Sequence, residues 1–349
     1  MVSDAEEALV QEQLEQLHDH HSEAHEDDIV SIALPAADGE EDIFGLAGTA
    51  VDGTQWTVGD CEHRFALQSI SKIVTYALAL EDNGREATLR HVGVEPSGDP
   101  FNSITFDDEH QRPHNPMINA GALVAAYLVA GDSPEEKVAR ILDRLRVFTG
   151  VPDLVVDGDL LADQLVSADR NLAISYLMRS LGMISGGIED NLAVYLSMCS
   201  VRVTTSELST LGATLANGGV NPLTGERALD TRHVRDVVSV MMTCGMYDAT
   251  GEWATDVGIP AKSGVSGGIV AVMPGRLGLA TYSPGLDEHG NSVRGQAVFR
   301  ELSERYGLHM FSSPDQTRFG RLRRTGGPRL TRVRPASDPR RAQCRSWSP

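Results

Sequence analysis

The order of strand-like and helix-like segments predicts an α+β fold built around one antiparallel sheet. Short β-type runs divided by Gly and Asp lie toward the N-terminal end, at 29–35, 43–51 and 54–60. Two further runs, at 267–275 and 276–285, lie toward the other end. A long stretch with helical periodicity separates the two groups. We therefore expect strands from both ends of the chain to pair in one sheet, with a helical region inserted between them.

The expected helices carry apolar residues at helical spacing, and several end at a glycine just after the last apolar turn. The last of them follows the second group of strands. They lie at 69–84, 119–131, 133–150, 171–182, 206–219 and 291–307.

Charge divides the chain into three zones. Residues 1–28 hold ten acidic residues and no Lys or Arg, which predicts an acidic N-terminal arm. Residues 29–310 read as one globular domain. Residues 311–349 form a basic tail: ten arginines face one acid within 318–349, among many Pro, Gly and Ser residues. That composition predicts disorder in the tail.

Composition excludes several classes of protein. The 349 residues are 41% hydrophobic, which suffices for a sizeable core. A net charge of −19 argues against nucleic acid as a partner of the globular domain. Because no run of about 18 uninterrupted apolar residues occurs, no membrane span is expected. The acidic N-terminus lacks the basic and apolar regions of a signal peptide, so we expect a cytoplasmic protein.

Cysteine and histidine give no convincing metal site. The four cysteines are widely spaced, which argues against a disulfide framework or a zinc site, and Cys199 and Cys244 are expected in the core. The cluster HDHH at 18–21, with His25 nearby, could supply metal ligands. No further ligand spacing completes such a site, so a solvated polar helix is the preferred interpretation. Neither a metal nor another cofactor is predicted.

Lysine is rare, and two of the three lysines stand next to a serine. Lys72 lies in SISK and Lys262 in AKSG, whereas Lys137 is the third. The other 27 of the 30 basic residues are arginine. Arginine cannot accept a proton in a protein, but lysine can when burial or nearby positive charge lowers its pKa. The retained lysines are therefore the first indication of chemistry.

Ser69 and Lys72 are three residues apart and would share one face of a helix. Serine is a poor nucleophile until a base takes its proton, and a neutral lysine could be that base. Taken alone, the Ser-x-x-Lys spacing fits a helix with one snorkelling lysine equally well. The segment AKSGVSGG (261–268) favours catalysis, because it resembles the Lys-Thr-Gly element that accompanies Ser-x-x-Lys in serine β-lactamases and penicillin-binding proteins.

A set of longer motifs closely resembles the serine-dependent glutaminases, which share the β-lactamase/transpeptidase-like fold. The resemblance runs almost continuously over about residues 60–310. Its motifs are QSISK, EPSGDPFN, PHNPMINAGAL, SADRNLAISYLM, YLSMCSVRVT, TLANGGVNPLTGER, CGMYDATGEWA and GIPAKSGVSGGI. The resemblance implies an enzyme that hydrolyses the side-chain amide of L-glutamine to L-glutamate and ammonia, with neither metal nor nucleotide.

The resemblance also implies roles for single residues. Ser69 would attack the amide and form a glutamyl ester, Lys72 would activate it, and Tyr247 would relay a proton to the leaving ammonia. The backbone N–H groups of Ser69 and Val265 would form the oxyanion hole, and Lys262 would add positive potential. Taken singly, the asparagines could be helix caps and the tyrosines structural. The implied substrate-binding residues are Gln68, Asn119, Gln164, Asn171, Tyr195, Lys262 and Val265.

Two positions depart from the family pattern. The family carries a glutamate where this chain has Gln164, and that glutamate would pair with the substrate ammonium group. A shift of one residue could bring in Asp163 instead. The family also carries a tyrosine where Ala33 falls here, in IALP. The first departure removes a charge that would pair with the substrate, although the amide can still accept a hydrogen bond. The second removes an aromatic ring and a hydroxyl.

Three alternatives therefore stay open. The chain could be a weakened or silent relative of the glutaminases, or one with a different amide substrate. It could be a β-lactamase-like amidase or peptidase, although the missing export signal argues against that. It could also be an amino-acid binder that kept the fold. Self-association into a dimer or tetramer is implied by the resemblance alone.

Overall fold

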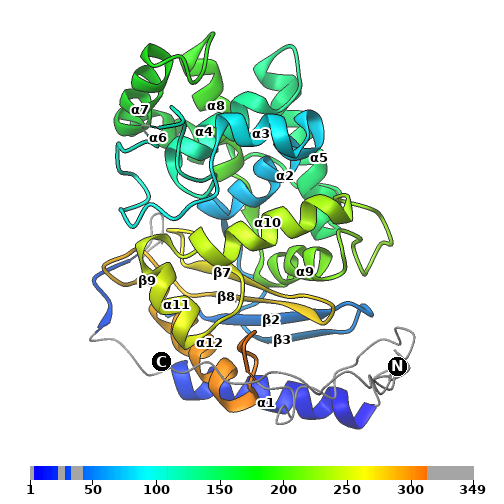
Figure 1. The fold of residues 1–349 in the computed structure, drawn as a ribbon. Coiled ribbons are helices and arrows are strands. Elements are labelled where there is room, and N and C mark those ends of the chain that lie inside the picture. Colours follow the sequence, from blue (N-terminus) through cyan, green and yellow to red (C-terminus); the bar gives the residue numbers. More distant parts are fainter. Residues whose placement is uncertain (1–3, 23–27, 33–41, 108, 313–349) are drawn as a thin grey trace, which may run out of the picture.

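A five-stranded antiparallel sheet forms one half of the molecule, and helices form the other half (Figure 1). The computed structural model describes residues 4–22, 28–32, 42–107 and 109–312. The strand order β3-β2-β8-β7-β6 places two strands from the N-terminal end of the chain beside three from the C-terminal end, as predicted. The prediction for the first run, 29–35, is wrong: its strand β1 pairs with β9 outside this sheet. The strands are β2 (Gly45–Ala50), β3 (Gln55–Gly59), β6 (Ala261–Ser263), β7 (Gly268–Met273) and β8 (Leu277–Tyr282).

The helical half contains the segment between β3 and β6. Two short sheets, β1 with β9 and β4 with β5, flank the main one. The remaining elements are α1 (Asp4–Ser22), β1 (Ser31–Ile32), β4 (Phe65–Ala66), η2 (Gln68–Ser71), α2 (Lys72–Asn83), α3 (Arg85–His91), α4 (Asn119–Leu128), α5 (Pro134–Thr149), α6 (Gly158–Val166), α7 (Asp169–Ser180), α8 (Ile188–Cys199), β5 (Arg202–Val203), α9 (Thr205–Ala216), α10 (Thr231–Cys244), η3 (Tyr247–Ala249), α11 (Thr250–Asp256), β9 (Gly285–Leu286) and α12 (Val293–Tyr306).

Both faces of the sheet are covered, so its central strands are buried at every position. Val270 and Val272 of β7 belong to the core cluster shared with the helical half. The alternate residues Ile269 and Ala271 belong to a second cluster with α1 and α12. This division follows the two-residue period of a strand.

Glycine lets α9 lie directly against the sheet. A Cβ added at Gly278 of β8 would come within 2.1 Å of the backbone nitrogen of Ala213 in α9. No side chain fits in that space, because real Cβ contacts do not fall below about 3 Å on van der Waals grounds. The close contact holds α9 directly on the central strands of the sheet.

Helix α1 is more firmly packed than the acidic composition of 1–28 predicts. Its Val10, Leu14 and Leu17 are buried in the cluster that includes Trp56 and Phe299. The expected polar helix is present, but the expectation of a solvated arm is corrected: an apolar stripe at i, i+4 and i+7 holds it on the sheet. Most of the basic tail, together with Ala33 and His25, lies outside the described residues.

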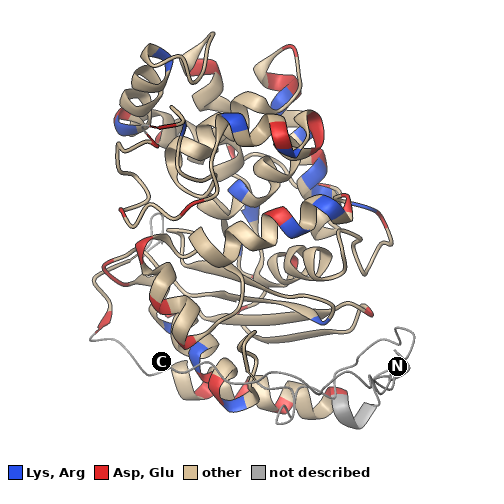
Figure 2. Ribbon diagram, in the orientation of Figure 1, with Lys and Arg blue, Asp and Glu red and all other residues tan. Residues whose placement is uncertain are grey.

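Charged residues gather on the outer helices and loops, with acidic and basic residues intermingled, while the strands are almost free of charge (Figure 2). Among the described helices, none has the length and the apolar character that crossing a membrane requires.

Candidate active site

Ser69 lies where the sheet edge meets the helical half. It belongs to the 3₁₀ turn η2, which leads directly into α2. The residue before it, Gln68, has a φ of 48°, in the left-handed region that side chains other than glycine rarely adopt. Such strain persists only where the surrounding structure enforces it, and it concentrates at functional sites. The strained residue is thus the immediate neighbour of Ser69 in the chain.

Lys72 is completely buried at the start of α2. Its Nζ donates to the carbonyl oxygen of Met117 at 3.0 Å and to Oδ1 of Asn119 at 2.8 Å. Burial lowers the pKa of Lys72 to about 7. A neutral amine has two N–H donors and one lone pair. Because both donors have acceptors, the lone pair remains available to take a proton.

Three helices bring Asn119, Asn171 and Tyr195 together beside Lys72. The amide of Asn119 donates from Nδ2 to Oδ1 of Asn171 at 3.0 Å, and the hydroxyl of Tyr195 donates to Oδ1 of Asn119 at 3.3 Å. The Nζ of Lys72 lies 5.9 Å from the centre of the Tyr195 ring. These residues are far apart in the sequence, yet they form one polar network on the predicted site.

Tyr247 supplies a phenol that stays protonated. Burial raises the pKa of Tyr247 to about 12, although hydrogen bonds with Ser69, Ser263 and the backbone of Val265 oppose the rise. Its hydroxyl donates to the carbonyl oxygen of Ser263 at 3.2 Å. Tyr247 also has a positive φ, 56°. A second strained residue thus hydrogen-bonds to Ser69, and its hydroxyl lies between Ser69 and Ser263 of β6.

Lys262 lies on β6 and is also completely buried. Its Nζ donates to the carbonyl oxygens of Gly245 at 3.0 Å and Ser263 at 2.6 Å, and it lies 4.3 Å from the centre of the Tyr247 ring. Burial, together with the positive charge of Lys72, lowers the pKa of Lys262 well below its ordinary value. The two buried lysines therefore oppose each other's protonation.

Gln164 lies in α6 and is partly buried, while its neighbour Asp163 is exposed. The Nε2 atom of Gln164 is buried without a hydrogen-bond partner among the residues that the structure describes. A buried amide without a partner is unfavourable and is usually satisfied by water or a ligand. Of the two residues considered from the sequence, Gln164 is thus the better placed to meet a ligand.

Sequence motifs do not predict several of the groups that form the site. Besides Asn119, the acceptors for the two lysines are the backbone carbonyls of Met117, Gly245 and Ser263, which no side-chain pattern reveals. Cys199 is a buried thiol, as expected of a core cysteine, but its Sγ also lies 3.8 Å from Oγ of Ser71. Burial raises the pKa of the Cys199 thiol, so it is a poor nucleophile at neutral pH.

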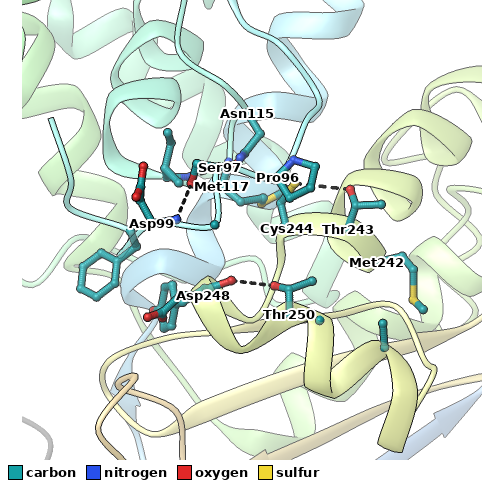
Figure 3. A pocket seen from close by; sticks show the side chains of 16 residues that line it. Pro96, Ser97, Asp99, Asn115, Met117, Met242, Thr243, Cys244, Asp248 and Thr250 are labelled. Carbon is teal, nitrogen blue, oxygen red and sulfur yellow. Dashed lines mark hydrogen bonds between the residues drawn. The ribbon is translucent and has the colours of Figure 1, made fainter. Parts of the chain in front are cut away.

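A cavity of about 460 Å³ borders the site through Tyr247 and Met117 (Figure 3). The loop at 96–101 and the segment at 242–254 supply most of its other walls. Ser69, Lys72 and the asparagine network do not line it. Through Tyr247, which hydrogen-bonds to Ser69, the cavity adjoins the site.

A serine that follows a strained glutamine, a buried lysine with a lowered pKa, a protonated tyrosine and a lysine on the neighbouring strand define a serine–lysine hydrolase of the β-lactamase-like class. A family model for glutaminase matches residues 33–311. The chain belongs to the glutaminase family.

Known relatives agree over most of the chain. A glutaminase of Microcystis aeruginosa is 46% identical over 299 residues, which cover 86% of this chain and 88% of that protein. A glutaminase of Trichormus variabilis is 48% identical over 270 residues, which cover 77% of this chain and 80% of that protein. The solved structure of a probable glutaminase, ybaS, superposes with a TM-score of 0.83 at 37% identity, covering 89% of this chain and all (100%) of that one.

Proposed function

We propose that this protein is a glutaminase that hydrolyses L-glutamine to L-glutamate and ammonia through a glutamyl ester on Ser69. The observation that carries the mechanism is the buried amine of Lys72, whose two donors are engaged and whose pKa is lowered to about 7. The match to the glutaminase family supports the substrate.

In the first half of the reaction, Lys72 takes the proton from the hydroxyl of Ser69. The serine oxygen attacks the side-chain carbonyl carbon of glutamine, and the oxyanion faces the backbone N–H groups of Ser69 and Val265. The carbon–nitrogen bond then breaks while Tyr247 gives its proton to the departing ammonia. The phenolate recovers a proton from Lys72, so the base is restored.

In the second half, Lys72 takes a proton from a water molecule that attacks the glutamyl ester. The ester bond breaks, glutamate leaves, and the protonated Lys72 returns its proton to the oxygen of Ser69, which restores the base. The network of Asn119, Asn171 and Tyr195 would hold the α-amino and α-carboxylate groups, which need polar partners once they leave water. Gln164 would accept from the ammonium group, and Gln68 and Lys262 would border the site.

Product analysis tests the proposal. Ammonia and glutamate should appear in equal amounts from L-glutamine, with much slower release from L-asparagine and no hydrolysis of the cephalosporin nitrocefin. Nitrocefin hydrolysis without glutamine turnover would favour a β-lactamase-like enzyme. A melting temperature raised by glutamine or glutamate, with no ammonia at any substrate concentration, would favour a silent amino-acid binder.

The activity should rise with pH through the pKa of Lys72. Below about 7 the amine is protonated and cannot act as a base, so kcat/KM should fall about tenfold per pH unit. Above that value the profile should stay level, because Tyr247 keeps its proton up to about 12. Initial rates at low glutamine concentration measure this profile. A flat profile between about pH 5 and 8 would contradict the role of Lys72 as the base.

Restoring the family glutamate should strengthen substrate binding. In Gln164→Glu, a carboxylate replaces the amide at the substrate ammonium group, and we expect KM for glutamine to fall by about tenfold, since charged hydrogen bonds contribute roughly 1.5–3 kcal/mol. Steady-state kinetics measure the change. The matched control is the exposed neighbour, Asp163→Asn, which should leave KM unchanged. An unchanged KM in Gln164→Glu would mean that Gln164 points away from the substrate. A change in KM for Asp163→Asn alone would mean that Asp163, one residue earlier, takes the place of the family glutamate.

We further propose that the protein self-associates, because it resembles the glutaminase family. We also propose, from its sequence, that it acts in the cytoplasm.

A further inference from the structure

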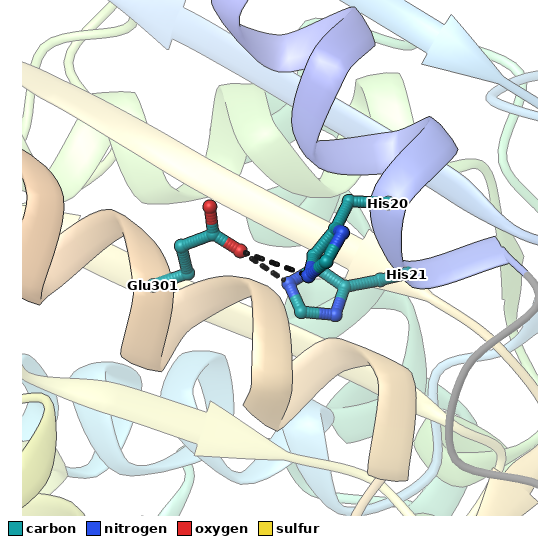
Figure 4. A group of neighbouring side chains, drawn as sticks. All are labelled: His20, His21 and Glu301. Carbon is teal, nitrogen blue, oxygen red and sulfur yellow. Dashed lines mark hydrogen bonds and ion pairs between the residues drawn. The ribbon is translucent and has the colours of Figure 1, made fainter.

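The C-terminal end of α1 and the middle of α12 bring together three side chains that can bind metal ions (Figure 4). His20 and His21 come from α1, and Glu301 comes from α12. Nε2 of His21 lies 2.8 Å from Oε2 of Glu301, and Nε2 of His20 lies 4.0 Å from the same oxygen. One potential ligand atom from each residue falls within 4.8 Å of the others.

We propose that His20, His21 and Glu301 form a Zn²⁺-binding site that joins α1 to α12. Imidazole nitrogens and a carboxylate oxygen are established zinc ligands at about 2.0–2.2 Å, so ligand atoms around a tetrahedral ion lie roughly 3.4 Å apart. The distances from Oε2 of Glu301 to Nε2 of His21, 2.8 Å, and to Nε2 of His20, 4.0 Å, lie on either side of that value. His20 is exposed and can rotate toward the ion without displacing packed neighbours.

The surroundings support a bound cation at this carboxylate. The second oxygen of Glu301, Oε1, pairs with Arg305 one turn along α12, which leaves Oε2 directed at the histidines. Such an outer partner orients a ligating carboxylate. Arg300 pairs with Asp256 at 3.4 Å, so its charge is directed elsewhere.

Water has access to the same place. A hollow of about 490 Å³ is lined by His21, Glu301 and Glu304, among others. Three protein ligands leave one tetrahedral position, and water from this hollow can fill it. The site is therefore expected to bind the ion reversibly and with an exchangeable ligand.

The bound ion would stabilise the attachment of α1 and leave catalysis unchanged. Helices α1 and α12 cover the face of the sheet that points away from the helical half, whereas Ser69 lies at the junction of the two halves (Figure 1). A ligand that binds only the folded state raises the melting temperature. Zn²⁺ should thus raise the melting temperature without altering the rate of glutamine hydrolysis.

The test compares the full-length, metal-free protein with His20→Ala and Glu301→Gln by calorimetric titration with Zn²⁺. The parent protein should bind one ion at this site, and each variant should lose at least about tenfold in that affinity. His110→Ala, which removes an exposed histidine elsewhere, should bind as the parent does. Because His20 is exposed, its replacement should not disturb folding.

A second measurement follows the melting temperature with Zn²⁺ and with Mg²⁺. Zn²⁺ should raise it in the parent and in His110→Ala but not in His20→Ala. Mg²⁺ should have no effect, because it prefers oxygen ligands. Equal Zn²⁺ affinity in the parent and both site variants, or no zinc-dependent rise in the parent, would overturn the proposal.

Discussion

Lys72→Met is expected to lower kcat/KM for glutamine by at least about 10³-fold, because general-base catalysis contributes roughly 10²–10⁴ and the serine also loses its activation. Methionine approximates the shape of the lysine stem in a fully buried position. It removes the donor to Met117 and Asn119, which should destabilise the fold by about 1–3 kcal/mol. Circular dichroism and the melting temperature would separate this loss of stability from the loss of rate.

Lys72→Arg tests whether residue 72 acts through its positive charge or as a proton acceptor. Arginine keeps N–H donors and carries a permanent positive charge, but it cannot accept a proton, so we expect it to be as inactive as the methionine variant. Retention of more than about a tenth of the parent rate in a folded Lys72→Arg protein would show that charge alone suffices, in conflict with the general-base role.

Lys137 offers a matched control for a lysine in a similar setting. Its Nζ donates to the carbonyl oxygen of Tyr127 at 2.7 Å and lies 5.6 Å from the centre of that ring. Burial lowers its pKa too. Lys137 lies in α5 and is not part of the network around Ser69. Lys137→Met should therefore leave kcat/KM unchanged, even if it lowers the melting temperature.

The architecture was predictable because strand and helix periods differ so clearly in this chain. The strands at 43–51 and 267–285 and the helices at 69–84, 119–131, 133–150, 171–182 and 206–219 were expected and are present, whereas α3, α6, α8, α10 and α11 were not predicted. The burial of α1 was missed, since the charge of 1–28 outweighed three apolar residues at helical spacing. Those residues gain their partners only when β2, β3 and α12 assemble from distant parts of the chain.

The site was predictable as a set of side chains but not as a set of contacts. Spacing placed Ser69 and Lys72 on one helical turn, and the motifs pointed to Tyr247. The spacing of side chains in the sequence does not predict which backbone carbonyls accept hydrogen bonds. The carbonyls of Met117 and Gly245, which hold the two lysines, are therefore known only from the structure. The positive φ of Gln68 and Tyr247 was equally hidden, because neither residue type favours that conformation.

Ser69→Ala should abolish glutamine hydrolysis, with a loss of about 10⁴-fold or more in kcat, because the variant has no oxygen to form the glutamyl ester. Ser71→Ala is the matched control: Ser71 is equally buried and only two residues away, but its hydroxyl lies against Cys199. It should keep kcat within a few-fold. Ammonia release measures both variants.

Substrate binding should survive in Ser69→Ala, because Asn119, Asn171 and Gln164 are untouched. Glutamine should still raise its melting temperature by a similar amount, which distinguishes lost chemistry from a lost site. If folded Ser69→Ala kept more than about a hundredth of the parent turnover, the attacking group would be another nucleophile or an activated water molecule, and the covalent route through Ser69 would be wrong. Loss of both activity and the glutamine-dependent shift would instead place Ser69 chiefly in binding.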